Sequence, residues 1–403
     1  MTVETIPVFQ SGSNKSPNVL PHVESYKGLR QEIQLREQRK FDQLQLKDFT
    51  FLTANLERFL PHIPASAYED IYLKLLYGRA LLNEETGMPE LIDRLDVVGA
   101  EAALAPENFP AVICTYHLGS YRSVIGIVAS KGLDFVLIVD ENTYHRQGDS
   151  IRKKVAEIHK AFGVTAFFDL LNAESPNIAM TLSKCLYEGK SIIAYIDGNT
   201  GGGGIFHKSE QFHLRIPFFG QEINSRKGIA AISWMNKRPI IPVISYYPDE
   251  ERKPPKVLFL PKIDPKEWAG APKEYIPEVT RKLYSELEKY LIQYYDQWET
   301  WLYLHKYLPP GVSTTRDIST ANYADLPANT QLKFNKTNFG LFMIENDCFL
   351  LNKRTYQCFQ LTEPCFKSLF KMSIKLKQEM EEEGFESIFI RDLLNIGVLE
   401  IHK

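Results

Sequence analysis

The sequence lacks the long apolar run, the paired cysteines and the strong net charge that mark several classes of protein. No stretch approaches the roughly 18 uninterrupted apolar residues of a membrane-spanning helix, so no integral span is expected. A net charge of -3 with 24% charged residues gives no overall reason to expect a nucleic acid as partner. The five cysteines are an odd number without C-x-x-C spacing, which argues against a disulfide framework or a zinc site. These absences favour a reducing, cytoplasmic setting, with peripheral contact to a membrane as the alternative.

Two further signals are missing. The opening MTVETIPVFQSGSNKSPNVLPH has no basic start followed by an apolar run, so we expect a flexible arm over residues 1–22 rather than a secretory signal. The run GNTGGGG, residues 198–204, lacks the Lys and Ser or Thr of a phosphate loop, which argues against a nucleotide site. It remains open whether this run is a bare hairpin connection or a loop that faces a substrate with Gly201 and Gly202.

The sequence does contain a regular alternation of strands and helices. Apolar, β-branched runs predict strands over 111–116, 134–140, 164–169 and 191–197, and helical patterns predict helices over 120–132, 150–163 and 175–189. Such alternation predicts an α/β fold with a mixed, mostly parallel sheet flanked by helices. Ligands of these sheets gather at the carboxyl ends of the strands, and His117, Asp140 and Asp197 each follow a predicted strand.

The remaining chain predicts more of the same domain and then a small second one. Residues 205–220 alternate like an antiparallel pair, 226–247 read as a helix and a strand, and 275–311 as one amphipathic helix that ends at Pro309 and Pro310. We expect a main domain over 23–312, a polar linker over 313–328 and a small α+β, winged-helix-like domain over 329–403. Within the small domain a hairpin is expected to turn at Asn352 and Lys353.

His117 is the candidate for chemistry. Its ordinary pKa of about 6.5 suits a group that takes a proton from an attacking hydroxyl or amine and later returns it. Gly119 permits close approach of the backbone, and the amides after His117 could bind an anion if they open a helix. The alternative is a structural histidine of the core. The basic side chains that could hold the phosphates of a carrier, or simply be solvated charges, are Arg152, Lys153, Lys154, Arg226 and Lys227.

Four blocks carry a resemblance to a known superfamily. They are LDVVGAEAALAPENFPAVICTYHLGSYR, SIIAYIDGNTGGGGIF, RIPFFGQEINSRKGIAAISWMNKRPIIPVI and WETWLYLHKYLPP, which together span about residues 90 to 310. In this order they resemble the lysophospholipid acyltransferase superfamily, and within it the lipid A biosynthesis acyltransferases. The resemblance implies a glycerolipid acyltransferase-like fold, an acyl-CoA or acyl carrier protein donor, and neither metal nor cofactor.

The resemblance also implies roles for single residues. It makes His117 the catalytic base and Asp197 the residue that orients the base or the acceptor, with backbone amides near Gly119 stabilising the oxyanion. The residues expected at the substrate are Gly119, Arg122, Asp140, Arg152, Gly201, Gly202, Phe219, Gly220 and Arg226.

One position departs from the family pattern. The family pairs its histidine with Asp or Glu after four intervening residues, and this chain has Arg122 there. The orienting acid is therefore open between Asp197, Asp140 and none at all, and loss of activity is a further alternative. Arg122 places a fixed positive charge beside the base, which disfavours the imidazolium unless a substrate phosphate neutralises it.

The tail carries a second, looser resemblance. FMIENDCFLLNKRTYQCFQLTEPCFKSLF followed by FIRDLLNIGVLEI resembles the peptide chaperone of pyrroloquinoline quinone biosynthesis, which implies capture of a peptide by strand addition. The N-terminal membrane helix usual for lipid A enzymes is also missing, which favours a soluble acceptor. We expect an acyltransferase acting on a hydroxyl or amine, with a peptide in natural-product (lipopeptide) biosynthesis as one acceptor. The alternatives are a non-catalytic peptide- or lipid-binding protein and a membrane-lipid acyltransferase.

Overall fold

The computed structural model describes most of the chain. It covers residues 46–85, 88–198, 213–248, 254–309, 326–372 and 374–402, together with Gly28, Gln31 and Glu32. The predicted arm, most of the predicted linker, Gly201 and Gly202 lie outside these described residues.

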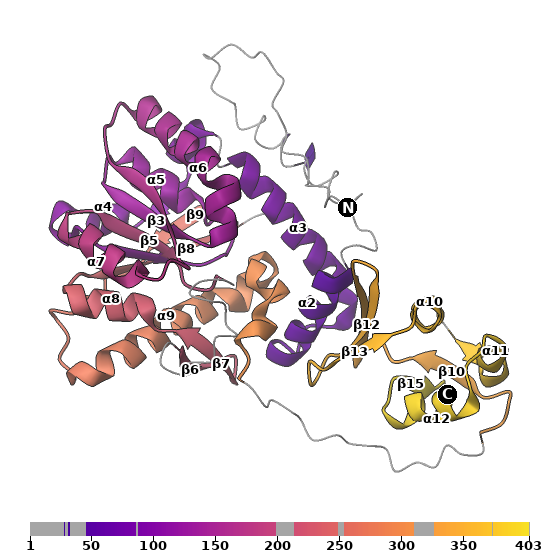
Figure 1. Ribbon diagram of the computed structural model, residues 1–403. Helices are drawn as coiled ribbons and strands as arrows, with labels where there is room; N and C mark the ends of the chain where they lie inside the picture. The colour runs from indigo at the N-terminus through magenta and orange to yellow at the C-terminus, as the bar shows by residue number, and fades with distance from the viewer. Residues whose placement is uncertain are drawn as a thin grey trace.

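A seven-stranded sheet forms the centre of the larger part of the protein (Figure 1). The strands in spatial order are β1 (Asp96–Val98), β9 (Lys256–Phe259), β8 (Ile240–Tyr246), β2 (Val112–Thr115), β5 (Ser191–Tyr195), β3 (Phe135–Val139) and β4 (Phe168–Asn172). Neighbouring strands are parallel except β8 and β9. The predicted α/β class with a mixed, mostly parallel sheet is confirmed.

Helices cover both faces of this sheet, so its central strands are mostly apolar. On one face lie α5 (Ser123–Ser130) and α6 (Glu141–Phe162), and on the other α7 (Ile178–Tyr187), α8 (Gly228–Asn236) and α9 (Pro272–Tyr294). Neighbouring residues of β5 show the two faces, because Ile193 packs against the α5 side and Ile192 against the α7 side. No helix among the described residues has the length and apolar character needed to cross a membrane.

The connections define one special place in the sheet. The chain leaves β2 through α5 toward β3, whereas it leaves β5 toward β8, on the opposite side of β2. The carboxyl ends of β2 and β5 are therefore adjacent, and the segments that follow them diverge. Ligands of open α/β sheets bind at such a switch point.

A separate apolar core covers the carboxyl ends of β2 and β5. It is built from α2 (Leu46–Phe59), α3 (Tyr68–Glu85), the hairpin of β6 (His213–Phe218) and β7 (Gln221–Arg226), and the turns after α9. Trp298 and Trp301 lie at its centre, and both side chains are fully buried.

The segment after α9 differs from the prediction. The amphipathic pattern predicted one helix up to Pro309, but α9 ends at Tyr294 and short 3-10 turns follow, η5 (Tyr295–Gln297), η6 (Glu299–Leu302) and η7 (Leu304–Tyr307). Trp298 has an extended backbone because it forms a β-bridge with Leu118, in the loop after β2. This long-range pairing overrides the local helical pattern.

Two strand predictions also need correction. The antiparallel pair expected within 205–220 is instead β6 with β7, and the turn between them is Phe219 and Gly220. Both residues have positive φ, 45° and 69°, as a two-residue hairpin turn requires. Strand β4 begins at Phe168 rather than at Val164, since it is Phe168 that pairs with Phe135 at the start of β3.

Residues from Leu326 onward form a smaller unit with its own apolar core. Its elements are β10 (Gln331–Phe334), β11 (Phe339–Ile344), β12 (Asp347–Asn352), β13 (Cys358–Leu361), α10 (Glu363–Lys371), β14 (Lys375–Leu376), α11 (Lys377–Glu382), α12 (Ser387–Asn395) and β15 (Leu399–Ile401). The predicted two-stranded hairpin is a three-stranded sheet, since β11 and β12 already turn at Glu345 and Asn346 and β13 follows Asn352 and Lys353 as a third strand.

This sheet packs against α2 of the larger part (Figure 1). Thr50 Oγ1 donates a hydrogen bond to the Leu341 carbonyl oxygen at 3.2 Å, and the rings of Phe51 and Phe342 are 5.6 Å apart. His305 of η7 is stacked on Phe51 at 3.8 Å, with Tyr356 of the small unit 6.2 Å away on a nearly parallel ring.

His305 predicts how this contact responds to acid. Burial, with smaller effects of Lys306 and Lys47, lowers the pKa of His305 to about 3, and its buried Nδ1 has no partner among the described residues. Below about pH 6.5 His305 binds a proton in the unfolded chain but stays neutral in the folded protein. The free energy of unfolding therefore falls as the pH falls. His305→Phe keeps an aromatic ring in the stack and removes this proton uptake. We therefore expect urea unfolding to show that the wild type loses stability relative to the variant between pH 7 and pH 4, and parallel curves for the two proteins would contradict it.

Candidate functional site

His117 and Asp197 meet at the switch point. His117 follows β2 and Asp197 follows β5, two adjacent parallel strands, and His117 Nδ1 lies 2.8 Å from Asp197 Oδ1. The main-chain amide of His117 also donates to both oxygens of this carboxylate, at 2.9 and 3.1 Å. The Asp197 side chain is 1% exposed and that of His117 is 19% exposed. With a proton held on Nδ1, the neutral imidazole has its free lone pair on Nε2.

Two further donors complete the environment of Asp197. Trp298 Nε1 donates to Oδ2 at 2.6 Å, and Thr300 Oγ1 donates to the same oxygen at 3.0 Å. A buried carboxylate is costly unless its oxygens are saturated with hydrogen bonds, and here donors come from two separate segments. The carboxylate thus fixes the η6 turn to the end of β5.

The pair shifts both pKa values. Burial alone disfavours the charged imidazole, but the Asp197 carboxylate, with Glu299 further out, outweighs it and raises the pKa of His117 above 6.5. Burial alone would raise the pKa of Asp197, but the His117 charge and the hydrogen bonds from His117 and Trp298 lower it. Each shift corresponds to a contribution to the free energy of unfolding. The contribution of His117 is lost as the pH rises through its raised pKa, and the contribution of Asp197 is lost as the pH falls through its lowered pKa. The pair therefore stabilises the fold fully between about pH 4 and 6.5.

A second ion pair lies behind the first. The Glu299 amide donates to the His117 carbonyl oxygen at 3.0 Å. Its carboxylate accepts from Arg79 Nε at 2.8 Å and from Tyr121 Oη at 3.2 Å. Burial opposes ionisation of Glu299, but Arg79 and then His117 lower its pKa. The charges thus alternate in sign from Asp197 through His117 and Glu299 to Arg79.

Aromatic rings flank the imidazole. The rings of Tyr121 and Tyr195 lie 4.8 and 5.0 Å from the His117 ring. Burial raises the pKa of both tyrosines, so both hydroxyls stay neutral. They restrict the orientation of the ring and keep water from most of its surface.

Arg122 lies beside this group without a carboxylate bound to it among the described residues. Its Nη1 donates to Asn83 Oδ1 at 2.9 Å, and Lys154 Nζ donates to the Asn83 carbonyl oxygen at 3.4 Å. Burial and then Arg122 lower the pKa of Lys154, and Arg122 also works against protonation of His117. Two cations from different elements therefore lie beside each other, and one of them, Arg122, acts on His117.

Gly119 has a structural role that the sequence did not reveal. Its φ is +55°, and a Cβ there would lie 2.5 Å from Tyr246 Cα and 2.8 Å from the Ser245 carbonyl oxygen on β8. Only glycine fits. Its amide donates to the Gln297 carbonyl oxygen at 3.3 Å, and the Leu118 amide donates to Tyr116. Both amides already donate hydrogen bonds within the protein, so they are not free to donate to an oxyanion as expected. An oxyanion would need a different donor.

Four of the other predicted site residues belong to elements other than those that carry His117 and Asp197. Asp140 is the N-cap of α6, where it accepts from the amide and the hydroxyl of Thr143 at 2.9 and 2.6 Å. Arg152 Nε donates to Asp169 Oδ1 on the edge strand β4 at 3.0 Å. Phe219 and Gly220 form the β6–β7 turn, and the Phe219 amide donates to Glu288.

Arg226 lies closer to the pair. It ends β7, and its charge acts on Tyr307, whose hydroxyl donates to the carbonyl oxygen of Gly198, next to Asp197. Gly201 and Gly202 lie outside the described residues. The structure therefore brings together His117, Asp197 and Arg122, places Arg226 near the segment of Asp197, and separates Asp140 and Arg152 from His117.

The sequence reasoning missed the partners on the η6 turn. Trp298, Glu299 and Thr300 stand in the block WETWLYLHKYLPP, which was noted for its order and given no chemical role. It also missed Glu85, whose Oε2 accepts from Ser120 Oγ at 2.8 Å and Tyr247 Oη at 2.7 Å and so anchors the loop after His117. Glu85 stands beside Glu84 in the polar run NEETG, so the sequence carried no signal that set it apart.

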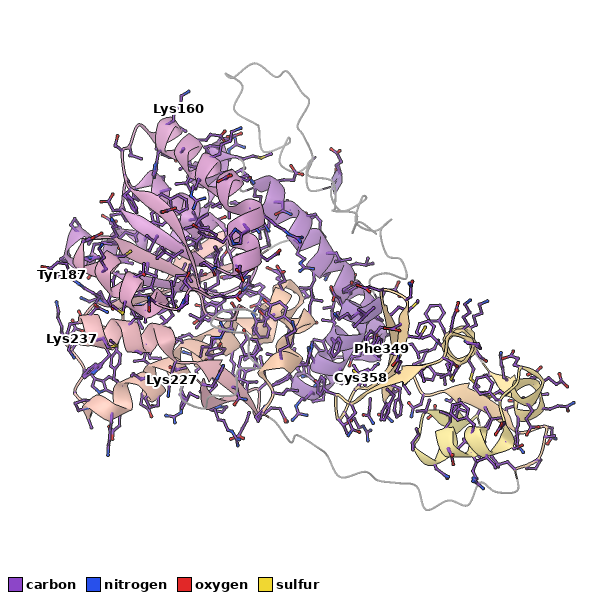
Figure 2. All side chains as sticks on the ribbon, viewed as in Figure 1. Lys160, Tyr187, Lys227, Lys237, Phe349 and Cys358 are labelled. Atoms are coloured by element: carbon purple, nitrogen blue, oxygen red, sulfur yellow. The ribbon has the colours of Figure 1, made fainter. Side chains whose placement is uncertain are left out.

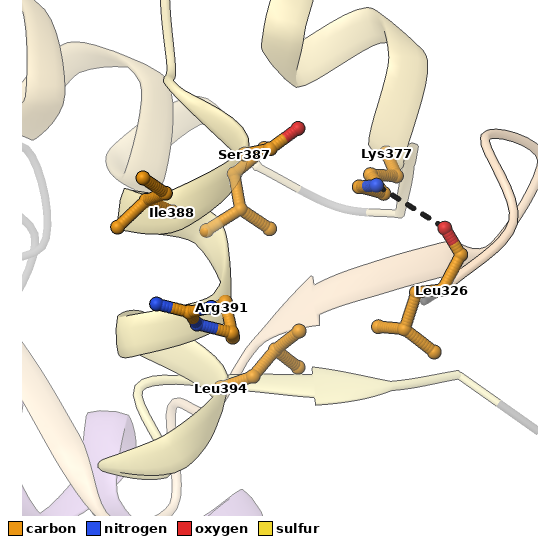
Figure 3. Close-up of a pocket in the computed structure, with 7 residues that line it drawn as sticks. Leu326, Lys377, Ser387, Ile388, Arg391 and Leu394 are labelled. Atoms are coloured by element: carbon orange, nitrogen blue, oxygen red, sulfur yellow. Dashed lines mark hydrogen bonds between the residues drawn. The ribbon is translucent and has the colours of Figure 1, made fainter. Parts of the chain in front are cut away.

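A small cavity lies elsewhere, in the C-terminal unit. It measures about 110 Å³, far below the roughly 300 Å³ at which ligand pockets begin, and Lys377 Nζ donates across it to the Leu326 carbonyl oxygen at 3.1 Å (Figure 3). Its walls include Ser387, Ile388, Arg391 and Leu394. A fatty acyl chain does not fit there. Within the described ranges, no three His, Cys, Asp or Glu side chains gather in a way that would hold a metal ion.

The pairing predicts the titration of His117. Asp197→Asn keeps the shape of the side chain and removes its charge, so burial then acts on the imidazole without its main opposing group. We expect the pKa of His117, followed by NMR of its ring protons, to fall below the wild-type value. Asp140→Asn, the same change at a helix cap, is the matched control and should leave the titration unchanged. Equal pKa values in wild type and Asp197→Asn would contradict the pairing.

No model of a known protein family matches the sequence, and a search of curated proteins gives no significant match.

Proposed function

We propose that the protein is an acyltransferase that moves a fatty acyl group from a thioester to a hydroxyl or amine. The donor is acyl-CoA or an acyl carrier protein, and we interpret the seven-stranded sheet with its flanking helices as a glycerolipid acyltransferase-like fold. The observation that carries the proposal is the His117–Asp197 pair at the switch point, with Nδ1 held by a buried carboxylate. This is the arrangement that a general base on an acyl transfer path requires.

The step follows from the pair. His117 Nε2 takes the proton of the acceptor as its oxygen or nitrogen attacks the thioester carbonyl carbon. The carbon–sulfur bond of the resulting tetrahedral intermediate breaks, and the imidazolium returns the proton to the departing thiolate. The products are an ester or amide and a free thiol. Asp197 and Glu299 support the transient imidazolium, which is consistent with the raised pKa of His117.

Arg122 and Lys154 supply the positive charge for the donor. Coenzyme A and the prosthetic arm of an acyl carrier protein share a phosphate, and two neighbouring cations, which meet at Asn83, suit its binding. A bound phosphate would also offset the effect of Arg122 on the imidazolium.

The acceptor is proposed to be a peptide. We interpret the C-terminal unit as winged-helix-like. Its strand β13 lies at the edge of the three-stranded sheet, where β12 is its only partner among the described strands. A strand edge of this kind can pair with an extended peptide. The alternatives are a membrane-lipid acceptor and a binding protein without catalysis.

The first test removes the base. Purified protein is incubated with a labelled long-chain acyl-CoA and, in separate reactions, with peptides carrying Ser and Lys side chains or with liposomes, and products are identified by mass spectrometry. We expect His117→Ala to lower the rate by about 10²–10⁴-fold. His145→Ala, at a histidine that is 66% exposed on α6, is the control and should retain wild-type rate. Equal background product from wild type and His117→Ala would reject the enzyme in favour of a binding protein, and acylation of lipid alone would reject the peptide acceptor.

The second test concerns Arg122. Arg122→Gln removes the charge and keeps hydrogen-bonding ability, so we expect KM for acyl-CoA to rise about tenfold or more, as for loss of one charged hydrogen bond. Transfer from an acyl-N-acetylcysteamine thioester, which has no phosphate, should keep its KM. Lys184→Gln, at a lysine that is 75% exposed on α7, is the matched control. Equal rises in KM for both donors would contradict a phosphate contact.

A further inference from the structure

Three groups of one short turn hold the His117–Asp197 pair. Trp298 Nε1 and Thr300 Oγ1 donate to Asp197 Oδ2, and the Glu299 amide donates to the His117 carbonyl oxygen. A displacement of the η6 turn would therefore move both members of the pair at once. What holds this turn in place also sets the geometry of the base.

Asn55 of α2 holds the turn through a hydrogen bond. Asn55 is fully buried, and its Nδ2 donates to the Trp301 carbonyl oxygen at 2.6 Å. Trp301 packs edge-on against Trp298, with ring centroids 4.8 Å apart, so Asn55 supports the same aromatic pair whose other member binds Asp197.

The amide of Asn55 is oriented by the C-terminal unit. Tyr356, in the connection between β12 and β13, donates its hydroxyl to Asn55 Oδ1 at 2.9 Å and lies 3.1 Å from the Ala54 carbonyl oxygen. Tyr356 has φ +59°, a strained conformation for a bulky residue, and Asn352 holds the connection through the amides of Arg354 and Thr355. The loop is built to keep this side chain directed at α2. Figure 2 shows Phe349 and Cys358, from the flanking strands, beside the same helix.

We propose that Tyr356 and Asn55 are positioning residues through which the C-terminal unit fixes the catalytic pair. The path is continuous: Tyr356 Oη to Asn55 Oδ1, Asn55 Nδ2 to the Trp301 carbonyl, and the η6 turn to His117 and Asp197. As a role in catalysis the inference rests on the proposed function. It gives the C-terminal unit a task besides binding an acceptor, because the base is fully ordered only while this unit is docked on α2.

The same interface offers a matched control. Thr50 Oγ1 donates to the Leu341 carbonyl oxygen, so Thr50→Val removes one hydroxyl from the α2 contact, as Tyr356→Phe does. Only Tyr356 leads to Asn55. A difference between these two variants therefore separates positioning of the pair from simple docking of the unit.

The readout is the titration of His117 in the full-length protein, followed by NMR without donor or acceptor. The groups that act on this ring are Asp197, Glu299, Arg122, Tyr121 and Tyr195, and none of them is changed by the variants. We expect Tyr356→Phe to lower the pKa of His117 by about 0.5 unit, the equivalent of one neutral hydrogen bond, since Asp197 is then less firmly held against the ring. Thr50→Val should leave the titration as in wild type.

A second variant breaks the same path at Asn55, in case the change in the pKa of His117 caused by Tyr356→Phe is too small to measure. Asn55→Leu has a similar shape, removes both the acceptor for Tyr356 and the donor to Trp301, and adds no charge, so it should lower the pKa of His117 at least as far as Tyr356→Phe. Thermal unfolding identifies any variant that has lost its fold. The proposal is overturned if Tyr356→Phe titrates like wild type, or if Thr50→Val shifts the pKa as much.

Failure of this inference is distinguishable from failure of the proposed function. If wild type transfers no acyl group, the function fails, while the titration still decides whether the C-terminal unit positions the pair. If wild type is active and the His117 titration is the same in all variants, the function stands and the positioning role falls.

Discussion

The negative charge of Asp197 is the constraint on which the site depends. Its side chain is almost completely buried, and such a carboxylate is tolerated only when donors surround it. The chain supplies them from two segments far apart in sequence, the loop that begins at His117 and the turn that carries Trp298 and Thr300. Satisfying one charge therefore ties the ends of β2 and β5 to the turns after α9, and the position of the imidazole is a consequence of that.

A second charge of the same sign extends this arrangement outward. Two carboxylates near each other repel, but His117 interacts favourably with both Asp197 and Glu299, and Arg79 pairs with Glu299. A proton on His117 is therefore favoured by two carboxylates, although the ring is mostly buried. A base that holds its proton more firmly is a stronger base once that proton is gone, and this is the property that deprotonation of a weakly acidic acceptor needs.

The sequence predicted the strands that carry the site but not which of them are neighbours. Apolar runs identify β2, β3 and β5 because both faces of each are covered, and they place His117, Asp140 and Asp197 at strand ends equally well. The choice between the two acids depends on β5 lying between β2 and β3, a long-range property absent from any local pattern. Asp140 did carry a local signal, since an Asp three residues before Thr143 at a helix start is typical of an N-cap. The η6 turn could not be predicted, because the bridge from Leu118 to Trp298 replaces a helix that the periodicity favours.

The carboxylate that contacts His117 belongs to Asp197, after the neighbouring strand, and this arrangement is compatible with an arginine at position 122. An acid on the loop of His117 itself would occupy the first turn of α5 and point at the base from its own segment. Here the acid arrives from the neighbouring strand and approaches Nδ1 and the His117 amide together, so the α5 side of the ring needs no negative charge. Glu299 is paired with Arg79, whereas Arg122 is bound only to the Asn83 amide oxygen among the described residues, with Lys154 beside it. A cation that acts on His117 attracts an anionic ligand, and under the proposed function that ligand is the phosphate of the donor.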